Sequence, residues 1–447
     1  MHAWESLNGS TYLAGGSYNE LKAMLGSGTL YDITPSDLTA GLEVASLITG
    51  YGYGDYGAGN YGDERANYGN YSEATVWSLD NFGEYLVACS ARVGSSGDGR
   101  LLEWQLGSAA DAAAISNAPI DCLGLVVTEE RFLFALGGRF PAESNANPRK
   151  VYWCDQEDNT TWTAATTNQA GSQELQTSGM IMQGLRTRGQ TLIITDIDAH
   201  VARYVGSPFI FGFERVGTAC GAISRKAAVD VDMGVFWMGQ RGFFGFQGNT
   251  VQQLPCAVHD YVFDDLNRVQ QSQIWAWSNV EYSEIWWFYP SSGSQQIDRY
   301  VAYNYNDNYW ITGNLSRTAG VPRGIFKHPL LISTNKTVYE HEKDGSLSYD
   351  GADVFAETGP ISLGNGDQTM NVMQLIPDEK TQGEVSLKFK TRFYPNGTES
   401  THGPYSPANP TGVRFAGRQF RMRVEGVEGK DWRVGNMRVD AFPAGKR

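Results

Sequence analysis

The sequence predicts an all-β protein, a β-propeller of about six blades followed by a smaller C-terminal β domain. Among the 447 residues are 52 glycines and 23 tyrosines, and only 19% are charged. Helical proteins instead favour Ala, Leu, Glu and Lys. Short apolar segments recur along the chain, and the C-terminal segments alternate apolar and charged residues with a period of two. Together these observations favour β structure in two parts.

The central repeat consists of six apolar segments, each followed by a second apolar segment. The first segments begin 47, 59, 44, 50 and 45 residues apart and span 85–88, 132–135, 191–194, 235–238, 285–288 and 330–333. Their partners span 101–104, 151–154, 201–205, 243–246, 300–305 and 337–341. A period of roughly 40 to 50 residues suits four-stranded propeller blades. Apolar residues at consecutive positions indicate strands that are buried on both faces.

The composition divides the chain into three regions. We expect residues 1–70 to form an N-terminal partial blade and a Tyr/Gly-rich loop, residues 71–365 the β-propeller, and residues 366–447 the C-terminal β-rich domain. The loop has no apolar periodicity, so we expect it to become ordered only against a partner. The candidate partner-contact residues in it are Tyr51, Tyr53, Tyr56, Tyr61 and Tyr68.

One segment has helical spacing. Between Pro255 and Gln273, apolar side chains recur at helical spacing, at Val258, Tyr261, Val262, Leu266 and Val269. This pattern predicts one amphipathic helix, inserted between two blades.

The C-terminal region carries its own charge balance. From Thr381 to Arg447 there are twelve Lys and Arg against six Asp and Glu, whereas the rest of the chain has a net charge of −20. Its arginines could face phosphates, but arginine commonly anchors protein interfaces, so we favour a subunit contact. The candidate interface residues are Arg418, Arg421, Arg423, Arg433 and Arg438.

Several functional classes are disfavoured. The net charge of −14 and the lack of a long basic run disfavour tight nucleic-acid binding. The sequence has no uninterrupted apolar run of roughly 18 residues and no secretion signal at its start, so we expect a soluble protein made in the cytoplasm. The five cysteines are at least 32 residues apart, a spacing that predicts buried thiols instead of a metal knuckle.

The residues that could form a metal site or a sugar-binding site are explained more simply as parts of the fold. On a strand, Asp196, Asp198 and His200 would share one face and could hold a metal ion, but a fourth ligand is missing nearby. The tryptophan-rich stretches 275–277 and 286–287 could stack against sugars, but they are better explained as blade core. We therefore predict no catalytic residue, no cofactor and no metal site, and a protein that is not an enzyme.

Several unusual strings occur in one order along nearly the whole chain. They are Tyr31–Pro35, the Tyr/Gly-rich loop, Tyr204–Phe209, Cys220–Arg225, Val235–Gly239, Glu284–Pro290, Gly417–Gln419 and Asp431–Gly435. In these strings the chain resembles the tail nozzle, or tail hub, proteins of short-tailed bacteriophages.

The resemblance implies a virion protein that forms a homohexameric ring below the portal and adaptor complex. Such a ring retains packaged DNA and conducts it during ejection, with double-stranded DNA passing through without specific binding, while tail fibres or other tail proteins dock outside. The resemblance brings no catalytic residues. Relatives carry a further N-terminal segment before the equivalent of Trp4.

The alternative function is a virion propeller that binds or cleaves carbohydrate during host attachment.

Overall fold

The computed structural model describes residues 1–47, 71–94, 96–343, 354–363, 368–378, 380–407, 411–426 and 432–445. The chain forms two compact units, Met1–His341 and Glu342–Arg447. Strands dominate both units, and no helix in the described ranges is long and apolar enough to cross a membrane.

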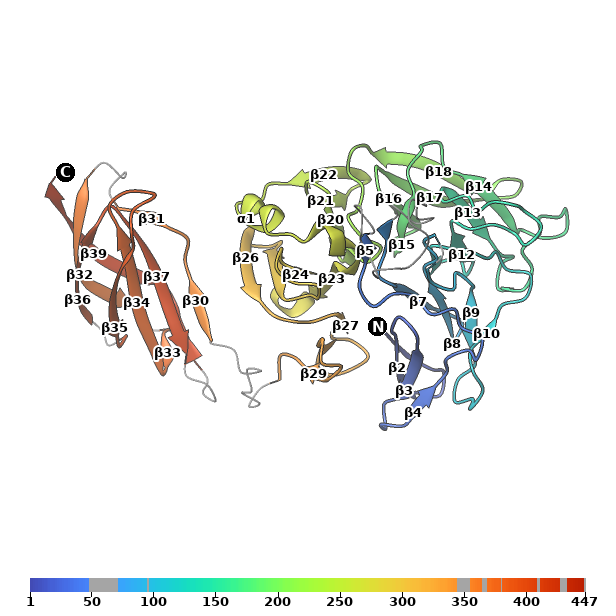
Figure 1. Cartoon of the computed structure of the whole chain (residues 1–447), viewed down its shortest axis with the longest axis horizontal. Coiled ribbons are helices and arrows are strands. Elements are labelled where there is room, and N and C mark those ends of the chain that lie inside the picture. Colours follow the sequence, from blue (N-terminus) through green and yellow to red (C-terminus); the bar gives the residue numbers. More distant parts are fainter. Residues whose placement is uncertain are drawn as a thin grey trace, which may run out of the picture. The chain divides into compact units, whose positions relative to one another are not determined.

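The described part of the first unit contains seven antiparallel sheets that form its blades, six with four strands and one with three (Figure 1). Blade 1 contains β1 (His2–Glu5), β2 (Thr11–Gly16), β3 (Leu21–Leu25) and β4 (Leu30–Asp32). Blade 2 contains β7 (Trp77–Phe82), β8 (Tyr85–Ser90), β9 (Leu102–Trp104) and β10 (Ala113–Ala114). Blade 3 contains β11 (Gly124–Val127), β12 (Leu133–Leu136), β13 (Lys150–Trp153) and β14 (Gly171–Glu174). Blade 4 contains β15 (Ile181–Thr187), β16 (Gln190–Thr195), β17 (Ala199–Gly206) and β18 (Ile210–Gly217).

The remaining blades follow in chain order. Blade 5 contains β19 (Ala228–Val231), β20 (Gly234–Gly239), β21 (Gly242–Gln247) and β22 (Thr250–Leu254). Blade 6 contains β23 (Trp275–Asn279), β24 (Glu284–Tyr289), β25 (Arg299–Asn304) and β26 (Tyr309–Asn314). Blade 7 contains β27 (Ala319–Val321), β28 (Leu330–Ile332) and β29 (Val338–Glu340). A separate short hairpin pairs β5 (Ser46–Leu47) with β6 (Tyr71–Ser72).

The first strand of each blade lies innermost, and these strands form a closed ring. Contacts run in order from β1 to β7, β11, β15, β19, β23 and β27, and β27 contacts β1 again. This arrangement confirms the predicted all-β propeller. The six apolar pairs found in the sequence are the second and third strands of blades 2 to 7.

Two predicted boundaries differ from the structure. Residues 1–32 form a full four-stranded blade, so the expected partial blade at the N-terminus is wrong, and the described ring has seven blades. The first unit ends at His341, not at residue 365. The physical reason is strand pairing, because β30 (Phe355–Glu357) and β31 (Ile361–Ser362) pair with a strand of the second unit.

Apolar side chains are buried between neighbouring blades, as sheets covered on both faces require. The cluster between blades 5 and 6 includes Phe236, Phe243 and Trp287, none more than 1% exposed. Among the described residues, the cluster between blades 1 and 7 contains three buried hydrophobic side chains, Leu13, Val321 and Leu330, with four partly buried ones packed against them: Met1, Ala3, Met24 and Phe326. The larger clusters elsewhere in the ring each have twelve or fourteen, and the one between blades 6 and 7 has five.

The predicted helix between blades 5 and 6 is interrupted. It consists of α1 (His259–Asp264) and the 3₁₀-helix η1 (Arg268–Gln273). Leu266 between them forms an isolated bridge with Ser291, and the amide of Asn267 donates to the carbonyl of Pro290. These contacts with blade 6 end the helix where sequence periodicity alone predicts that it continues.

The second unit consists of two main sheets around one core. The first contains β30, β31, β34 (Val385–Arg392), β35 (Ser400–Tyr405) and β37 (Gln419–Gly426). The second contains β32 (Thr369–Pro377), β36 (Thr411–Gly417) and β39 (Met437–Gly445), and a short pair joins β33 (Gln382–Gly383) to β38 (Trp432–Arg433). Phe389 of the first sheet and Val372 of the second are both fully buried in the shared core. The predicted alternation of β34 is confirmed, because every second side chain is buried.

Candidate functional site

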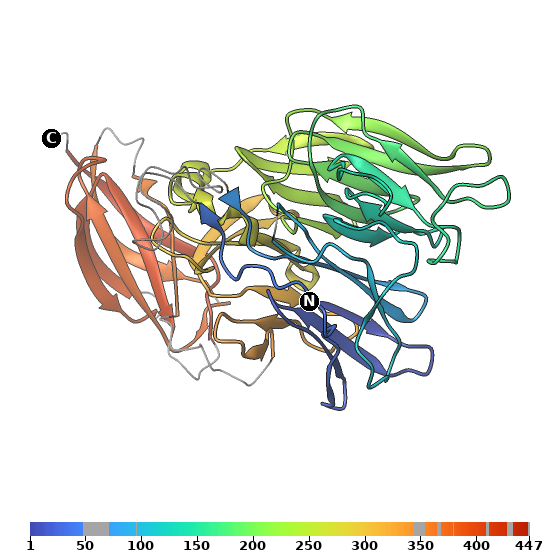
Figure 2. The same cartoon turned by 45° about the vertical axis from the view of Figure 1, so that its right-hand side comes forward.

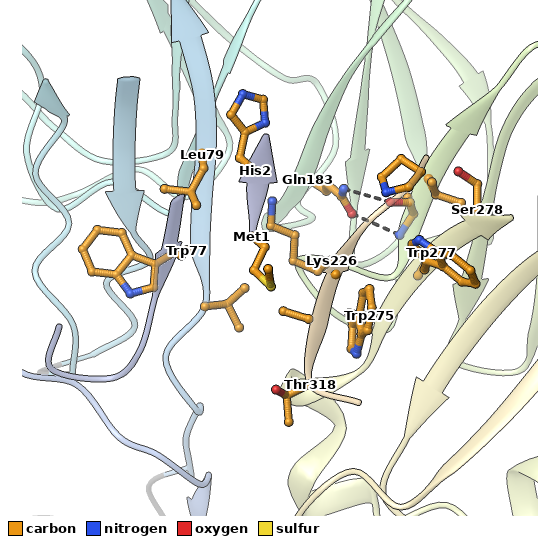
Figure 3. Close-up of a pocket in the computed structure, with 18 of the residues that line it drawn as sticks. Met1, His2, Trp77, Leu79, Gln183, Lys226, Trp275, Trp277, Ser278 and Thr318 are labelled. Atoms are coloured by element: carbon orange, nitrogen blue, oxygen red, sulfur yellow. Dashed lines mark hydrogen bonds between the residues drawn. The ribbon is translucent and has the colours of Figure 1, made fainter. Parts of the chain in front are cut away.

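A cavity of about 1970 Å³ is lined in part by six of the seven inner strands, all but β11, and in part by loops and other strands of the propeller, so it includes the propeller axis. Figure 3 shows Lys226 and Gln183 among its lining side chains, with Trp275 and Trp277 on the blade 6 side. The lining combines apolar surface with charged groups, including Arg186. A wall of this kind can hold water or a small molecule, and by itself it identifies no reaction.

Burial perturbs the charged groups around this cavity. It lowers the pKa of Lys226, and the charge of Asp80 only partly opposes this effect. Burial also lowers the pKa of His2 and raises the pKa of Asp230. Arg186 lies 3.5 Å from the Asp80 carboxylate. In the described ranges, no group of three His, Cys, Asp or Glu side chains could hold a metal ion.

Gln183 joins the inner strands of blades 4 and 5. Its Nε2 donates to the carbonyl of Ala228 at 3.0 Å, and its Oε1 accepts from the amide of Ala228 at 3.1 Å (Figure 3). The side-chain amide thus replaces a backbone partner where two strands of different sheets approach each other.

A two-stranded ribbon, which we call the strap, extends from the connection between blades 1 and 2. It consists of residues 42–47 and 71–75 and includes β5 and β6. Its two legs also join where the amide of Thr75 donates to Leu42 O at 2.8 Å and Thr75 Oγ1 accepts from the amide of Leu42 at 2.8 Å. Leu42, Glu43, Ala74 and Thr75 line the axial cavity, so the strap covers part of it.

The near end of the strap is fixed to blades 1 and 2. The amide of Gly41 donates to Tyr18 O in blade 1, and the amide of Thr39 donates to Asp98 in blade 2. Burial alone would raise the pKa of Asp98, but hydrogen bonds from Arg100 and Thr39 outweigh it and lower that pKa. Gly41 is required here, because a Cβ would lie 1.7 Å from Thr75 Oγ1.

The far end of the strap contacts η1, on the opposite side of the ring. The Gln270 side chain both accepts from the amide of Ala45 and donates to its carbonyl, each at 2.8 Å. Ser272 Oγ accepts from the amide of Ala74 at 3.0 Å, and Tyr71 OH donates to Val269 O at 2.9 Å. Figure 2 shows the two blue arrows of β5 and β6 beside the yellow-green helical segment, away from the other blue strands.

An ion pair links the strap to the connection between blades 4 and 5. Arg225, only 2% exposed, lies 3.3 Å from the Glu73 carboxylate and donates to Ile181 O at 2.9 Å. A buried pair of this kind contributes little net stability, but removing one partner leaves an uncompensated charge. Separating Arg225 from Glu73 is therefore unfavourable, so the pair ties the strap to this connection.

The structure separates the predicted interface arginines into different environments. Arg421 and Arg423 lie on β37 and share the Glu357 carboxylate, each at 3.5 Å, with Lys390 at 2.8 Å. Burial would raise the pKa of Glu357, but these cations lower it. Arg418 stacks over the Tyr394 ring. Arg421 and Arg423 are thus already engaged within their own sheet.

The other two predicted arginines are more accessible. Arg433 on β38 and Arg438 on β39 are exposed, and neither forms an ion pair with a described residue. The five candidate arginines therefore divide: Arg421 and Arg423 share β37, Arg418 lies between β36 and β37, and Arg433 and Arg438 lie on strands of two other sheets. The five loop tyrosines, Tyr51, Tyr53, Tyr56, Tyr61 and Tyr68, lie outside the described residues.

The candidate metal residues instead form a structural hydrogen-bond network. Thr195 Oγ1 donates to Asp198 Oδ1 at 2.6 Å, and His200 Nε2 lies 3.1 Å from the same oxygen. The Asp196 carboxylate accepts from the amide of Met180 instead of joining them. The tryptophans Trp275, Trp277 and Trp287 are buried core residues, as predicted, whereas Trp286 is only partly buried against them. Cys89, Cys122, Cys154 and Cys220 are buried free thiols, whereas Cys256 is partly exposed.

Sequence reasoning missed the residues that hold the strap. Gln270 is fully buried but lies in a segment that the periodicity assigned to a helix. Its partner Ala45 is 225 residues away. A polar residue such as Gln270 or Glu73 has no sequence pattern that reveals so distant a contact.

Comparisons with known proteins show similarity at the level of fold. No protein-family model and no curated protein matches the chain. Similar solved structures include virginiamycin B lyase from Staphylococcus aureus, at 8% identity and a TM-score of 0.38, covering 75% of this chain and 92% of that one. The computationally designed Ika8 protein has 11% identity, a TM-score of 0.35, and coverage of 73% and 93%. The AfRom2 CNH domain has 10% identity, a TM-score of 0.35, and coverage of 76% and 93%. Similarity this low carries no functional argument, and the propeller assignment is based on the sheets and their ring of contacts.

Proposed function

We propose that this protein is a non-enzymatic structural component of a short-tailed phage virion and that copies of it form the tail nozzle ring. The observation that carries the proposal is the series of resembling strings, which occur in one order through both compact units. In this role the ring, expected to be a homohexamer, lies below the portal and adaptor, and tail fibres or other tail proteins dock outside.

The charge distribution supports a conducting role. Residues 1–341 contain 21 Lys and Arg against 35 Asp and Glu, a net charge of −14, whereas residues 342–447 contain 14 of each. An acidic wall repels DNA phosphates, so a polyanion can slide past it without adhering. Closed rings require heterologous contacts, and the accessible Arg433 and Arg438 are suitable anchors for such contacts.

The test is assembly of the purified chain, alone and with its adaptor, followed by electron microscopy. We expect sixfold rings with a central channel. The double variant Arg433→Glu/Arg438→Glu should weaken assembly by about tenfold or more, because interface arginines commonly dominate binding. Arg188→Glu is the control, because this arginine is highly exposed on the propeller and its pair with Asp232 is long, 3.6 Å.

The alternative function predicts a different result. Chains that stay monomeric with the adaptor, and that bind or hydrolyse host glycan, would contradict the nozzle and support a carbohydrate-binding or carbohydrate-cleaving propeller. If the Arg433→Glu/Arg438→Glu variant forms rings as well as the parent protein does, these two arginines do not belong to the subunit interface.

A further inference from the structure

The propeller ring closes at its smallest apolar interface. All strands of blade 1 come from residues 2–32 and all described strands of blade 7 from residues 319–340. The two ends of the ring therefore share no described strand, and Leu13, Val321 and Leu330 are the buried hydrophobic residues between them. Closing this seam brings together segments about 300 residues apart, which costs chain entropy.

The strap crosses the ring independently of this seam. Its near end is fixed to blades 1 and 2 through Gly41 and Thr39, and its far end to η1 through Gln270 and Ser272. The Glu73 and Arg225 pair adds a tie to the connection between blades 4 and 5. These contacts fix blade 1 relative to the opposite side of the ring, whether or not blade 7 touches it.

We propose that the strap is a clasp that keeps the propeller closed, with Gln270 as its main anchor. Gln270 is fully buried and makes two hydrogen bonds to the backbone of Ala45, one as donor and one as acceptor. Its Nε2 also donates to Gln295 Oε1 at 2.9 Å, which holds the amide in place within blade 6. Releasing the clasp leaves the seam between blades 1 and 7 as the only closure of the ring in the described part of the chain.

The protein contains a matched control for this anchor. Gln183 makes the same pair of hydrogen bonds, to the backbone of Ala228, but it joins neighbouring blades 4 and 5 instead of crossing the ring. Gln270→Ala and Gln183→Ala therefore each remove one donor and acceptor pair to a backbone amide group, and Gln270→Ala also removes the bonds of Gln270 with Gln295 and Gln273. Only the first variant should disturb the distant seam.

The experiment is hydrogen exchange followed by mass spectrometry on the full chain. In Gln270→Ala, we expect the amides of β1, β2, β27 and β28 to exchange about tenfold faster, since the two buried hydrogen bonds that anchor the strap to η1 are lost. In Gln183→Ala, faster exchange should stay near β15 and β19, and the seam should change less than about twofold.

Two outcomes contradict the clasp. One is a Gln270→Ala protein in which faster exchange is confined to η1 and the strap. The other is an equal response of the seam to both variants. If Gln270→Ala does not fold, Ser272→Ala, which loses the bond from Ala74 and the contact with Tyr71 but keeps Gln270, is judged by the same criteria with a smaller expected effect. The measurement reports on single chains and so is separable from ring assembly.

Discussion

His200 illustrates at the residue scale how a candidate site can be a structural element. Its ring is almost fully buried beside Asp198 and Thr177, each contact at 3.1 Å. Burial lowers the pKa of His200 below 6.5, against the opposing charge of Asp198. Asp198 and His200, whose spacing suggested a metal site, instead bond to Thr177 and so hold the β16–β17 turn against the segment before β15.

This environment predicts a pH dependence. Because the folded pKa lies below 6.5, the unfolded chain binds more protons as the pH falls through 6.5, so His200 destabilises the fold at acidic pH. In His200→Gln, the free energy of unfolding should fall less steeply between about pH 7.5 and 5, by at most about 1.4 kcal/mol per pH unit, the limit for one proton. Denaturant unfolding at several pH values measures this slope.

His259 provides a control of opposite sign. A hydrogen bond to Asp260 raises its pKa, so its contribution to stability is present below pH 6.5 and is lost as the pH rises above that value. In His259→Gln, the free energy of unfolding should therefore fall more steeply as the pH drops. The change should be small, because the His259 side chain is more exposed than that of His200. Identical slopes for His200→Gln and the parent protein would contradict the assignment.

At the element scale, the strap depends on a close approach of its two legs. Gly41 directly precedes the first leg. Thr75 on the second leg fills the space that a side chain at position 41 would need. The strap also gives the polar residues of η1 their partners, because Gln270 bonds to Ala45 and Ser272 to Ala74.

Gly41→Ala should destabilise the protein by about 1–3 kcal/mol, the usual cost of inserting a methyl group into packed structure. Chemical denaturation measures the change. Gly324→Ala is the control, since a Cβ there meets nothing within 4 Å, and it should stay within about 0.5 kcal/mol of the parent. Equal stability of both variants would show that the legs of the strap separate at little cost.

At the scale of the whole molecule, the two compact units have separate cores. The core around Phe389 contains only residues from the second unit, and the clusters of the propeller contain only residues from the first. Separate cores predict separate cooperative transitions.

Calorimetry of the full chain should therefore show two unfolding transitions. Phe389→Ala should destabilise only one of them, by about 3–5 kcal/mol, as expected for a large buried aromatic side chain. Trp287→Ala, between blades 5 and 6, should shift only the other transition. A single transition that both variants shift together would contradict independent units.

The sequence by itself determined the strand pairs of blades 2 to 7, the alternation of β34 and the burial of Trp275, Trp277 and Trp287. These features follow from local patterns of apolar residues, which report burial directly. Only the tertiary structure decided that residues 1–32 complete a seventh blade, that Arg421 and Arg423 both pair with Glu357, and that Gln270 holds Ala45 across the ring. Such contacts join residues far apart in the chain, and their energies depend on where the backbone brings polar groups together, which no local pattern encodes.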